Sequence, residues 1–139
     1  MTSYTSTVAP KKKTVLLVDD DAKLLQGLKR ALSGEDYELY TAISPAEAKA
    51  FLNTCPVDLV LSDNLMPGVL GTEFLADVHS QYPTTKLMML SGYLPPTAAQ
   101  KAMDNIGISQ ILNKPCKASE VATAIRDVLA SAETANENG

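Results

Sequence analysis

Five short strand-like runs alternate with amphipathic stretches along this chain, and the alternation limits its fold more than any other feature of the sequence. The runs occupy 14–18, 37–42, 57–61, 87–90 and 108–112. Short, largely aliphatic runs are typical of parallel strands, and the stretches between them repeat their apolar residues at helical spacing. The sequence therefore predicts an α/β fold, in which a five-stranded parallel sheet is covered by five helices.

Helix boundaries are marked by local signals. Before the second helix, Ser44 is a typical N-cap, Pro45 fits the first helical position, and Glu47 follows three residues after the cap. Gly34 and Gly107 stand where the first and fourth helices are expected to end. These signals place the helices between consecutive strands, as a parallel sheet requires.

The length of 139 residues leaves room for one domain. We expect this domain at 14–130, with a disordered N-terminal tail at 1–13 and a C-terminal tail at 131–139, because both ends are polar and lack an apolar face. Hydrophobic residues make up 45% of the chain and charged residues 20%, a balance typical of globular proteins.

Charge and hydropathy exclude several classes of function. The net charge is −4, and the only basic cluster, Lys11–Lys13, is too short to follow a phosphate backbone, so we expect no direct nucleic-acid binding. No stretch of uninterrupted apolar residues is long enough for membrane insertion. The first residues lack the apolar core of a secretory signal, and neither Cys55 nor Cys116 has a second Cys or a His nearby at metal-ligand spacing. We therefore expect a cytoplasmic protein with reduced thiols.

Polar side chains follow four of the five predicted strands. They are Asp19 to Asp21 after the first, Asp63 after the third, Ser91 after the fourth and Lys114 after the fifth. Because the carboxyl ends of parallel strands meet at one edge of a sheet, these groups are expected to converge there. A single polar residue at a strand end is ordinary turn chemistry, but this combination on four strands indicates a site.

Electrostatics predicts what such a site holds. If Asp19, Asp20 and Asp63 converge to about 5 Å, each pair of charges repels by roughly 3 kcal/mol at an effective dielectric constant near 20. Either the pKa values rise or cations occupy the site. Lys114 supplies one positive charge, and Mg²⁺, which prefers carboxylate oxygens, supplies two more. Because Mg²⁺ commonly shares its coordination shell with a phosphate, the expected substrate carries a phosphoryl group.

The same residues carry a resemblance to a known family. Four motifs follow the strands in order: Val18-Asp19-Asp20, Asp63 with Met66-Pro67, Leu90-Ser91-Gly92 and Lys114-Pro115. From about Thr14 to Leu129 the chain resembles the receiver domains of bacterial two-component response regulators, in their single-domain, chemotaxis-regulator-like form. The resemblance implies a flavodoxin-like (βα)5 three-layer sandwich with strand order 2-1-3-4-5, and a Lys114-Pro115 bond that is usually cis.

The resemblance also implies the chemistry of the site. Asp63 would become a 4-aspartylphosphate by accepting a phosphoryl group from the phosphohistidine of a sensor histidine kinase or phosphotransfer protein. Ser91 and Lys114 would hold the phosphoryl oxygens. Such a protein catalyses its own phosphorylation and dephosphorylation and does not turn over an external substrate.

The metal ligands are implied in the same way. Asp20 would bind Mg²⁺ directly and Asp19 would hold its shell through water. Asp63 and the main-chain carbonyl of Leu65 would complete the protein ligands.

Phosphorylation in this family changes a binding surface. The resemblance implies that Ser91 moves inward and alters the face formed by the fourth helix, fifth strand and fifth helix, to which a downstream protein binds. It also implies a monomer or a phosphorylation-dependent dimer. Ile111 stands at the strand-five position that often carries Tyr or Phe, so an aromatic rotamer switch is not expected here.

Two other interpretations are weighed against this one. Asp19-x-Asp21, Ser91 and a later lysine also resemble the haloacid dehalogenase phosphatases, which use an Asp nucleophile with Mg²⁺. That family needs a further acidic pair on a strand after the lysine, which the sequence lacks, and Asp63 would be unexplained. The other interpretation is a degenerate receiver that serves only as a binding module, although every chemical position is filled.

Overall fold

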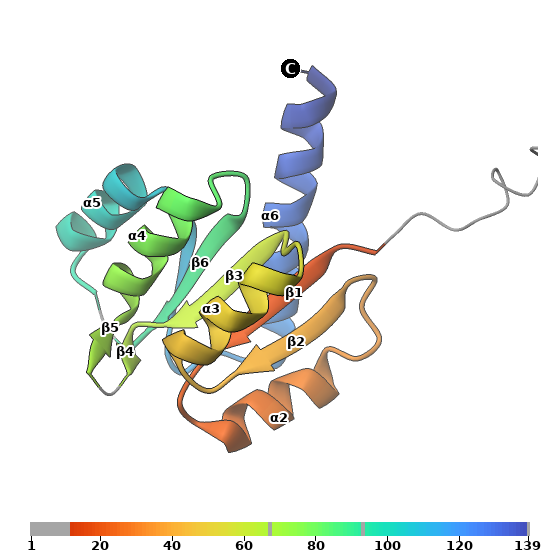
Figure 1. Cartoon of the computed structure of the whole chain (residues 1–139), viewed down its shortest axis with the longest axis horizontal. Helices are drawn as coiled ribbons and strands as arrows, with labels where there is room; N and C mark the ends of the chain where they lie inside the picture. The colour runs from red at the N-terminus through yellow and green to blue at the C-terminus, as the bar shows by residue number, and fades with distance from the viewer. Residues whose placement is uncertain (1–11, 67, 93, 139) are drawn as a thin grey trace, which may run out of the picture.

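The computed structural model describes residues 12–66, 68–92 and 94–138, without the side chains of Leu65, Val69 and 132–138 (Figure 1). Residues 1–11, which make up most of the expected N-terminal tail, lie outside this range, as does Pro67 of the Met66-Pro67 motif. No helix within the described residues is long and apolar enough to cross a bilayer.

The core of the molecule is a five-stranded sheet whose neighbouring strands are all parallel. Its strand order, β2-β1-β3-β6-β7, confirms the predicted order of 2-1-3-4-5 when the five strands are counted along the chain. The strands are β1 (Thr14–Val18), β2 (Glu38–Ala42), β3 (Leu59–Asp63), β6 (Lys86–Ser91) and β7 (Ile108–Asn113). Strands β1 and β3 are buried along their whole length, as their aliphatic sequences predict.

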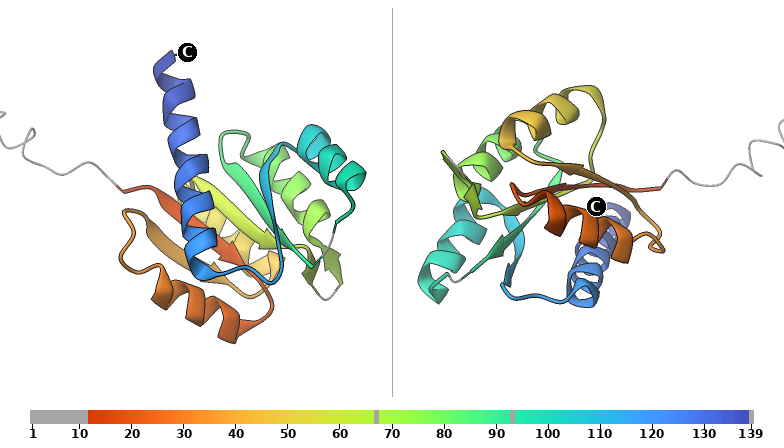
Figure 2. Two further views of the ribbon diagram at one scale, coloured as in Figure 1. Left: turned by 180° about the vertical axis from the view of Figure 1, so that it is seen from behind. Right: turned by 90° about the horizontal axis from the view of Figure 1, so that it is seen from below.

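Five helices cover the two faces of the sheet. They are α2 (Ala22–Ala31), α3 (Pro45–Thr54), α4 (Gly71–Gln81), α5 (Pro96–Ile106) and α6 (Ala118–Asn138). Helices α2 and α6 pack on one face, while α3, α4 and α5 pack on the other, as the view from below in Figure 2 shows. Each face has its own hydrophobic cluster, so the sheet is buried between two cores.

Two of the three predicted helix signals act as expected, whereas α2 ends at Ala31, with Leu32 as its C-cap, before the predicted end at Gly34. The Ser44 side chain accepts a hydrogen bond from the main-chain N–H of Glu47, and Pro45 is the first residue of α3. Gly107 ends α5 in the left-handed conformation, with φ of 87°, which glycine adopts without strain. These two boundaries fix the start of α3 and the chain reversal into β7.

The structure differs from the sequence prediction in two further places. The turn residues between Met66 and Gly71 indicate a turn after the third strand, but the structure has an antiparallel pair of two-residue strands there, β4 (Leu65–Met66) and β5 (Val69–Leu70), with Gly68 at a φ of 78° between them. Helix α6 continues past Ala130 to Asn138, because neither Gly nor Pro interrupts this segment. A domain boundary at 130 stays a prediction.

Candidate functional site

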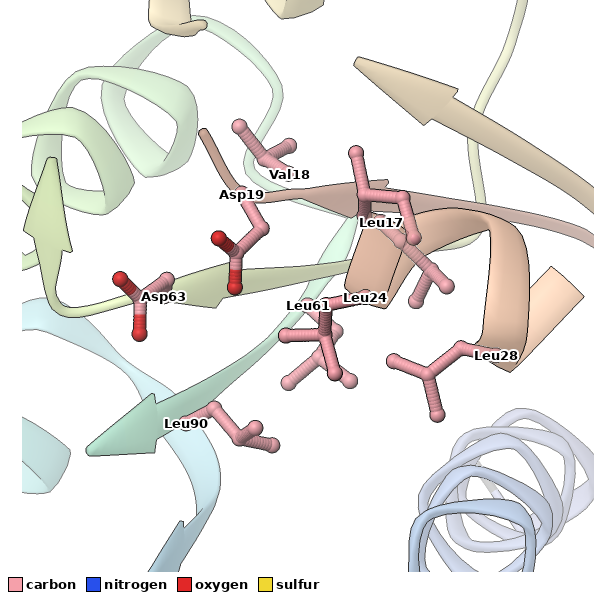
Figure 3. A pocket seen from close by; sticks show the side chains of 9 residues that line it. Leu17, Val18, Asp19, Leu24, Leu28, Leu61, Asp63 and Leu90 are labelled. Atoms are coloured by element: carbon pink, nitrogen blue, oxygen red, sulfur yellow. The ribbon is translucent and has the colours of Figure 1, made fainter. Parts of the chain in front are cut away.

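Three carboxylates converge at the carboxyl edge of the sheet. Asp19 and Asp20 directly follow β1, and Asp63 is the last residue of the neighbouring strand β3. One carboxylate oxygen from each lies within 4.8 Å of the others. Figure 3 shows the side chains of Asp19 and Asp63 next to each other, at one side of a group of leucines. The structure thus brings together the three acids that the strand pattern predicted.

The floor beneath these acids is aliphatic. Asp19 and Asp63 are each 6% exposed, whereas Asp20 is exposed. A cavity of about 10 Å³ is lined by Asp19, Asp63, Val18 and six leucines: Leu17, Leu24, Leu25, Leu28, Leu61 and Leu90. Burial against this floor raises the pKa of Asp19, since the carboxylate loses water on that side, although the N–H of Asp21 opposes the shift.

Lys114 brings a positive charge to the acids. It directly follows β7, and its Nζ lies 2.6 Å from Asp63 Oδ1. Partial burial lowers the pKa of Lys114, but the hydrogen bond and charge of Asp63, with smaller contributions from Asp19 and Asp20, outweigh burial and raise the pKa above its usual value. The lysine therefore stays charged beside the buried acid.

Ser91 occupies the strand end between these groups. It is the last residue of β6, it is buried, and it follows Leu90, the partner of Asp63 in the β3–β6 ladder. The main-chain N–H of Lys114 donates to the carbonyl of Ser91 at 2.7 Å. This bond joins the ends of β6 and β7, so the hydroxyl and the ammonium are held on adjacent strand ends. The Lys114-Pro115 peptide bond is cis.

Asp21 has a different role from its two neighbours. Its side chain accepts hydrogen bonds from the main-chain N–H groups of Lys23 and Leu24, and it forms the N-cap of α2. Among the described residues the acidic cluster comprises Asp19, Asp20 and Asp63, without Asp21. Helix capping thus accounts for the second acid of the Asp19-x-Asp21 pattern that favoured a phosphatase.

Two further residues at the site were missed by the sequence interpretation. The Oγ of Ser62 donates a hydrogen bond to the main-chain carbonyl of Asp63 at 2.9 Å. Gly71, the first residue of α4, lies so close to Asp63 that an added Cβ would stand 2.8 Å from the Cα of Asn64 and closer still to the carbonyl of Asp63. A small polar residue inside an aliphatic run and a glycine opening a helix were the only signals for these contacts.

Main-chain hydrogen bonds hold the residue after Asp63 to both β6 and the start of α4. The N–H of Asn64 donates to the carbonyl of Leu90 at 2.9 Å, and the N–H of Gly71 donates to the carbonyl of Asn64 at 2.7 Å. Leu65 follows in β4, and the role of its carbonyl as a metal ligand stays a prediction. The site as a whole combines oxygen ligands suited to a hard cation with an ammonium and a hydroxyl suited to an anion.

Comparison with known proteins agrees with this arrangement. The family model for the response regulator receiver domain matches residues 15–126. A CheY-like response regulator receiver domain protein from Methanospirillum hungatei superposes with a TM-score of 0.81 at 29% identity, covering 89% of this chain and 98% of that one. A signal receiver domain from Pseudomonas fluorescens gives a TM-score of 0.82 at 32% identity, covering 94% and 96%. The fold is therefore the predicted flavodoxin-like one.

Similar proteins of known role are longer than this chain. The hydrogenase transcriptional regulatory protein HoxA of Cupriavidus necator is 32% identical over 88% of this chain and 25% of its own length. The transcriptional regulatory protein GlrR of Escherichia coli is 35% identical over 83% of this chain and 26% of its own length. The chain thus spans about a quarter of the length of either regulator.

Proposed function

Since the chain belongs to the receiver domain family of response regulators, we propose that it accepts a phosphoryl group on Asp63 in two-component signal transduction. The donor is the phosphohistidine of a sensor histidine kinase or of a phosphotransfer protein. The observation that carries the proposal is the 2.6 Å contact between Lys114 and Asp63 within a cluster of three acids. A buried carboxylate in contact with an ammonium group is suited to receive a phosphoryl group, because the ammonium offsets the added negative charge.

The donor set of the cluster fits Mg²⁺. Three carboxylates offer hard oxygen ligands within 4.8 Å of one another, and Lys114 alone leaves their negative charge uncompensated. Asp19, Asp20, Asp63 and the Leu65 carbonyl would hold the ion. When bound, Mg²⁺ supplies positive charge that neutralises the acids and the phosphoryl oxygens.

Phosphoryl transfer here needs positioning and charge neutralisation rather than acid–base chemistry. With acetyl phosphate as donor, a carboxylate oxygen of Asp63 forms a bond to phosphorus while the bond from phosphorus to the acetyl oxygen breaks. Acetate leaves with the electron pair, and no proton has to move. Lys114 offsets the charge of the phosphoryl oxygens, and the Ser91 hydroxyl donates a hydrogen bond to one of them.

The switch follows from the connection between strand ends. A phosphoryl group on Asp63 offers acceptors to Ser91, whose carbonyl is bonded to the N–H of Lys114 at the end of β7. Movement of Ser91 is thereby passed to the face of α5, β7 and α6, where we place the downstream protein partner. Ile111 of β7 is half-buried against the cluster that includes α4 and α5, so packing of this strand replaces an aromatic rotamer change.

We place the protein in the cytoplasm, as a monomer or a phosphorylation-dependent dimer. The experiment that tests its chemistry is intact-mass spectrometry after incubation with acetyl phosphate and Mg²⁺. We expect one phosphoryl adduct that hydroxylamine removes, because an acyl phosphate is labile to this nucleophile. Peptide mapping should locate the adduct at Asp63.

Two variants separate this function from its alternatives. Asp63→Asn should abolish the adduct, because the amide is not a nucleophile. An adduct that survives Asp63→Asn, together with hydrolysis of phosphate esters that is lost in Asp19→Asn, would support a phosphatase instead. Absence of any adduct in the wild-type protein, with either acetyl phosphate or phosphoramidate, would leave only a binding module.

A further inference from the structure

We propose that Ser62 is a positioning residue for phosphoryl transfer and Mg²⁺ binding, acting through the peptide that joins Asp63 to Asn64. This inference rests on the proposed function of Asp63. Ser62 is fully buried, at 0% exposure, and its Oγ donates to the carbonyl oxygen of Asp63 at 2.9 Å. Its hydroxyl therefore contacts the main chain of the phosphorylated residue and leaves the carboxylate free.

The neighbours of Ser62 on its face of the sheet are apolar, so they offer its hydroxyl no side-chain partner. Side chains alternate along a strand, so Ser62 shares its face of the sheet with Val60, whereas Asp63 shares the opposite face with Leu61. In the parallel ladders Ser62 pairs with Val18 and Met89, both in the hydrophobic cluster on its face. An apolar side chain would serve packing equally well at this position. A hydroxyl there has to find a partner, and the carbonyl of Asp63 provides it.

The peptide between Asp63 and Asn64 is thereby held at both of its polar atoms. Its carbonyl accepts from Ser62, and its N–H, which belongs to Asn64, donates to the carbonyl of Leu90 at 2.9 Å. These two bonds set the orientation of the plane in which the chain leaves β3. Asp63 precedes this peptide, and Leu65, whose carbonyl we propose as a metal ligand, follows Asn64.

Loss of the Ser62 hydroxyl should thus act on the site without touching any reacting atom. Outer-sphere partners of this kind typically change metal affinity or activity by about 10-fold to 100-fold when removed. In Ser62→Ala we expect about 10-fold weaker Mg²⁺ binding and a similar fall in the rate of phosphorylation at a fixed, subsaturating Mg²⁺ concentration. Saturating Mg²⁺ should restore part of the rate, because part of the defect lies in metal binding.

A matched control lies at the amino edge of the sheet, just before β6. Thr85 is also buried, and its Oγ1 donates to the carbonyl of Val57, just before β3, at 2.8 Å. Thr85→Val removes a buried hydroxyl bonded to the main chain, as Ser62→Ala does, but at the amino edge of the sheet. Both variants should lower the melting temperature by a few degrees, roughly 3 to 5 °C. Only Ser62→Ala should weaken Mg²⁺ binding and slow phosphorylation of Asp63.

The test measures Mg²⁺ affinity by isothermal titration calorimetry and the rate of adduct formation with phosphoramidate, in the wild-type protein, Ser62→Ala, Ser62→Thr and Thr85→Val. Ser62→Thr keeps the hydroxyl and should bind Mg²⁺ more tightly than Ser62→Ala. Weaker Mg²⁺ binding in Ser62→Ala, without the same loss in Thr85→Val, supports the inference. Unchanged affinity and rate in Ser62→Ala, or an equal loss in Thr85→Val, overturns it. A wild-type protein that binds Mg²⁺ but forms no adduct overturns the proposed function, while the affinities still test Ser62.

Discussion

The Nζ of Lys114 and the Oδ1 of Asp63 lie 2.6 Å apart, although 50 residues of chain and the whole of β6 separate them. The lysine side chain is about one-third exposed, whereas the acid is buried. The cation therefore reaches the carboxylate from the open side of the site, where a phosphoryl group has to enter. This geometry makes Lys114 more important for chemistry than for stability.

Replacement of Lys114 by Met should separate these two contributions. We expect adduct formation at Asp63 to fall by about 10²-fold, because a cation aimed at developing charge is lost. The free energy of unfolding should change by only about 1 kcal/mol, since solvent screens the partly exposed lysine. Rates are measured by mass spectrometry and stability by urea unfolding. Lys49→Met removes another Lys–Asp pair, with Asp77 at 3.1 Å, and should leave adduct formation unchanged.

Repulsion among the three clustered carboxylates should lower the free energy of unfolding of the metal-free protein. Asp19→Asn keeps an oxygen that accepts the N–H of Asp21 but removes one of three charges within 4.8 Å. We expect the free energy of unfolding at neutral pH without Mg²⁺ to rise by about 1 to 3 kcal/mol. Stabilisation by added Mg²⁺ should shrink in this variant, because a ligand is lost. Asp36→Asn, which changes an exposed acid outside the cluster, is the control. An equal gain in both variants would contradict the idea of local repulsion.

The part of the site made of strand ends could be predicted from the sequence, and the part made of main-chain contacts could not. Asp19, Asp63 and Lys114 each follow a recognisable strand, and parallel strands bring such ends together whatever the details of packing. The bond from Ser62 to the carbonyl of Asp63 depends on the angle at which the chain leaves β3, and no periodicity encodes that angle.

The hairpin after β3 shows the same limit. Gly68 and its neighbours indicate a turn, but β4 and β5 are two residues each, too short for an alternating pattern. Their pairing of Leu65 with Leu70 becomes visible only in three dimensions. In contrast, the cap at Ser44 is local, and the start of α3 is where the sequence places it.

Alkaline pH should lower the free energy of unfolding, because Tyr37 is buried in the hydrophobic core. Tyr37 is 7% exposed, and its hydroxyl has no hydrogen-bond partner among the described residues. Burial, aided by the charge of Glu35 and opposed by Arg126, raises the pKa of Tyr37 from 10.0 to about 12. Between these values the unfolded chain releases the proton that the native protein retains. Stability from this group is thus complete below pH 10 and is lost as the pH rises to about 12.

Tyr37→Phe tests this explanation by urea unfolding at pH 8 and pH 11. At pH 8 the variant should be as stable as the wild type or about 1 kcal/mol more stable, because an unpaired buried hydroxyl is removed. Its further loss of stability on going to pH 11 should be smaller than in the wild type. Tyr40→Phe removes a phenol that is 38% exposed and is the control for this measurement. Identical pH profiles for all three proteins would show that Tyr37 ionises normally.

Two glycine substitutions should change stability in opposite directions. Gly71 opens α4 against the main chain of Asp63, and a Cβ there would stand 2.8 Å from the Cα of Asn64. Gly71→Ala should therefore lower the free energy of unfolding by about 1 to 3 kcal/mol, because backbone atoms have to move. Gly27 lies within α2, and nothing is within 4 Å of an added Cβ. Gly27→Ala should raise the free energy of unfolding by about 0.5 to 1 kcal/mol, because alanine loses less conformational entropy in a helix.

The two variants also differ in what they should do to the chemistry. Movement of the Asp63 carbonyl away from residue 71 displaces the peptide that Ser62 holds, so Gly71→Ala should slow adduct formation at Asp63. Gly27→Ala should not change this rate, because α2 residue 27 is exposed and contacts no residue of the site. If Gly71→Ala is destabilised but is phosphorylated at the wild-type rate, the α4 start supports the fold without positioning the acceptor. If it is slowed at a temperature where it is fully folded, the close approach of α4 is needed to aim Asp63.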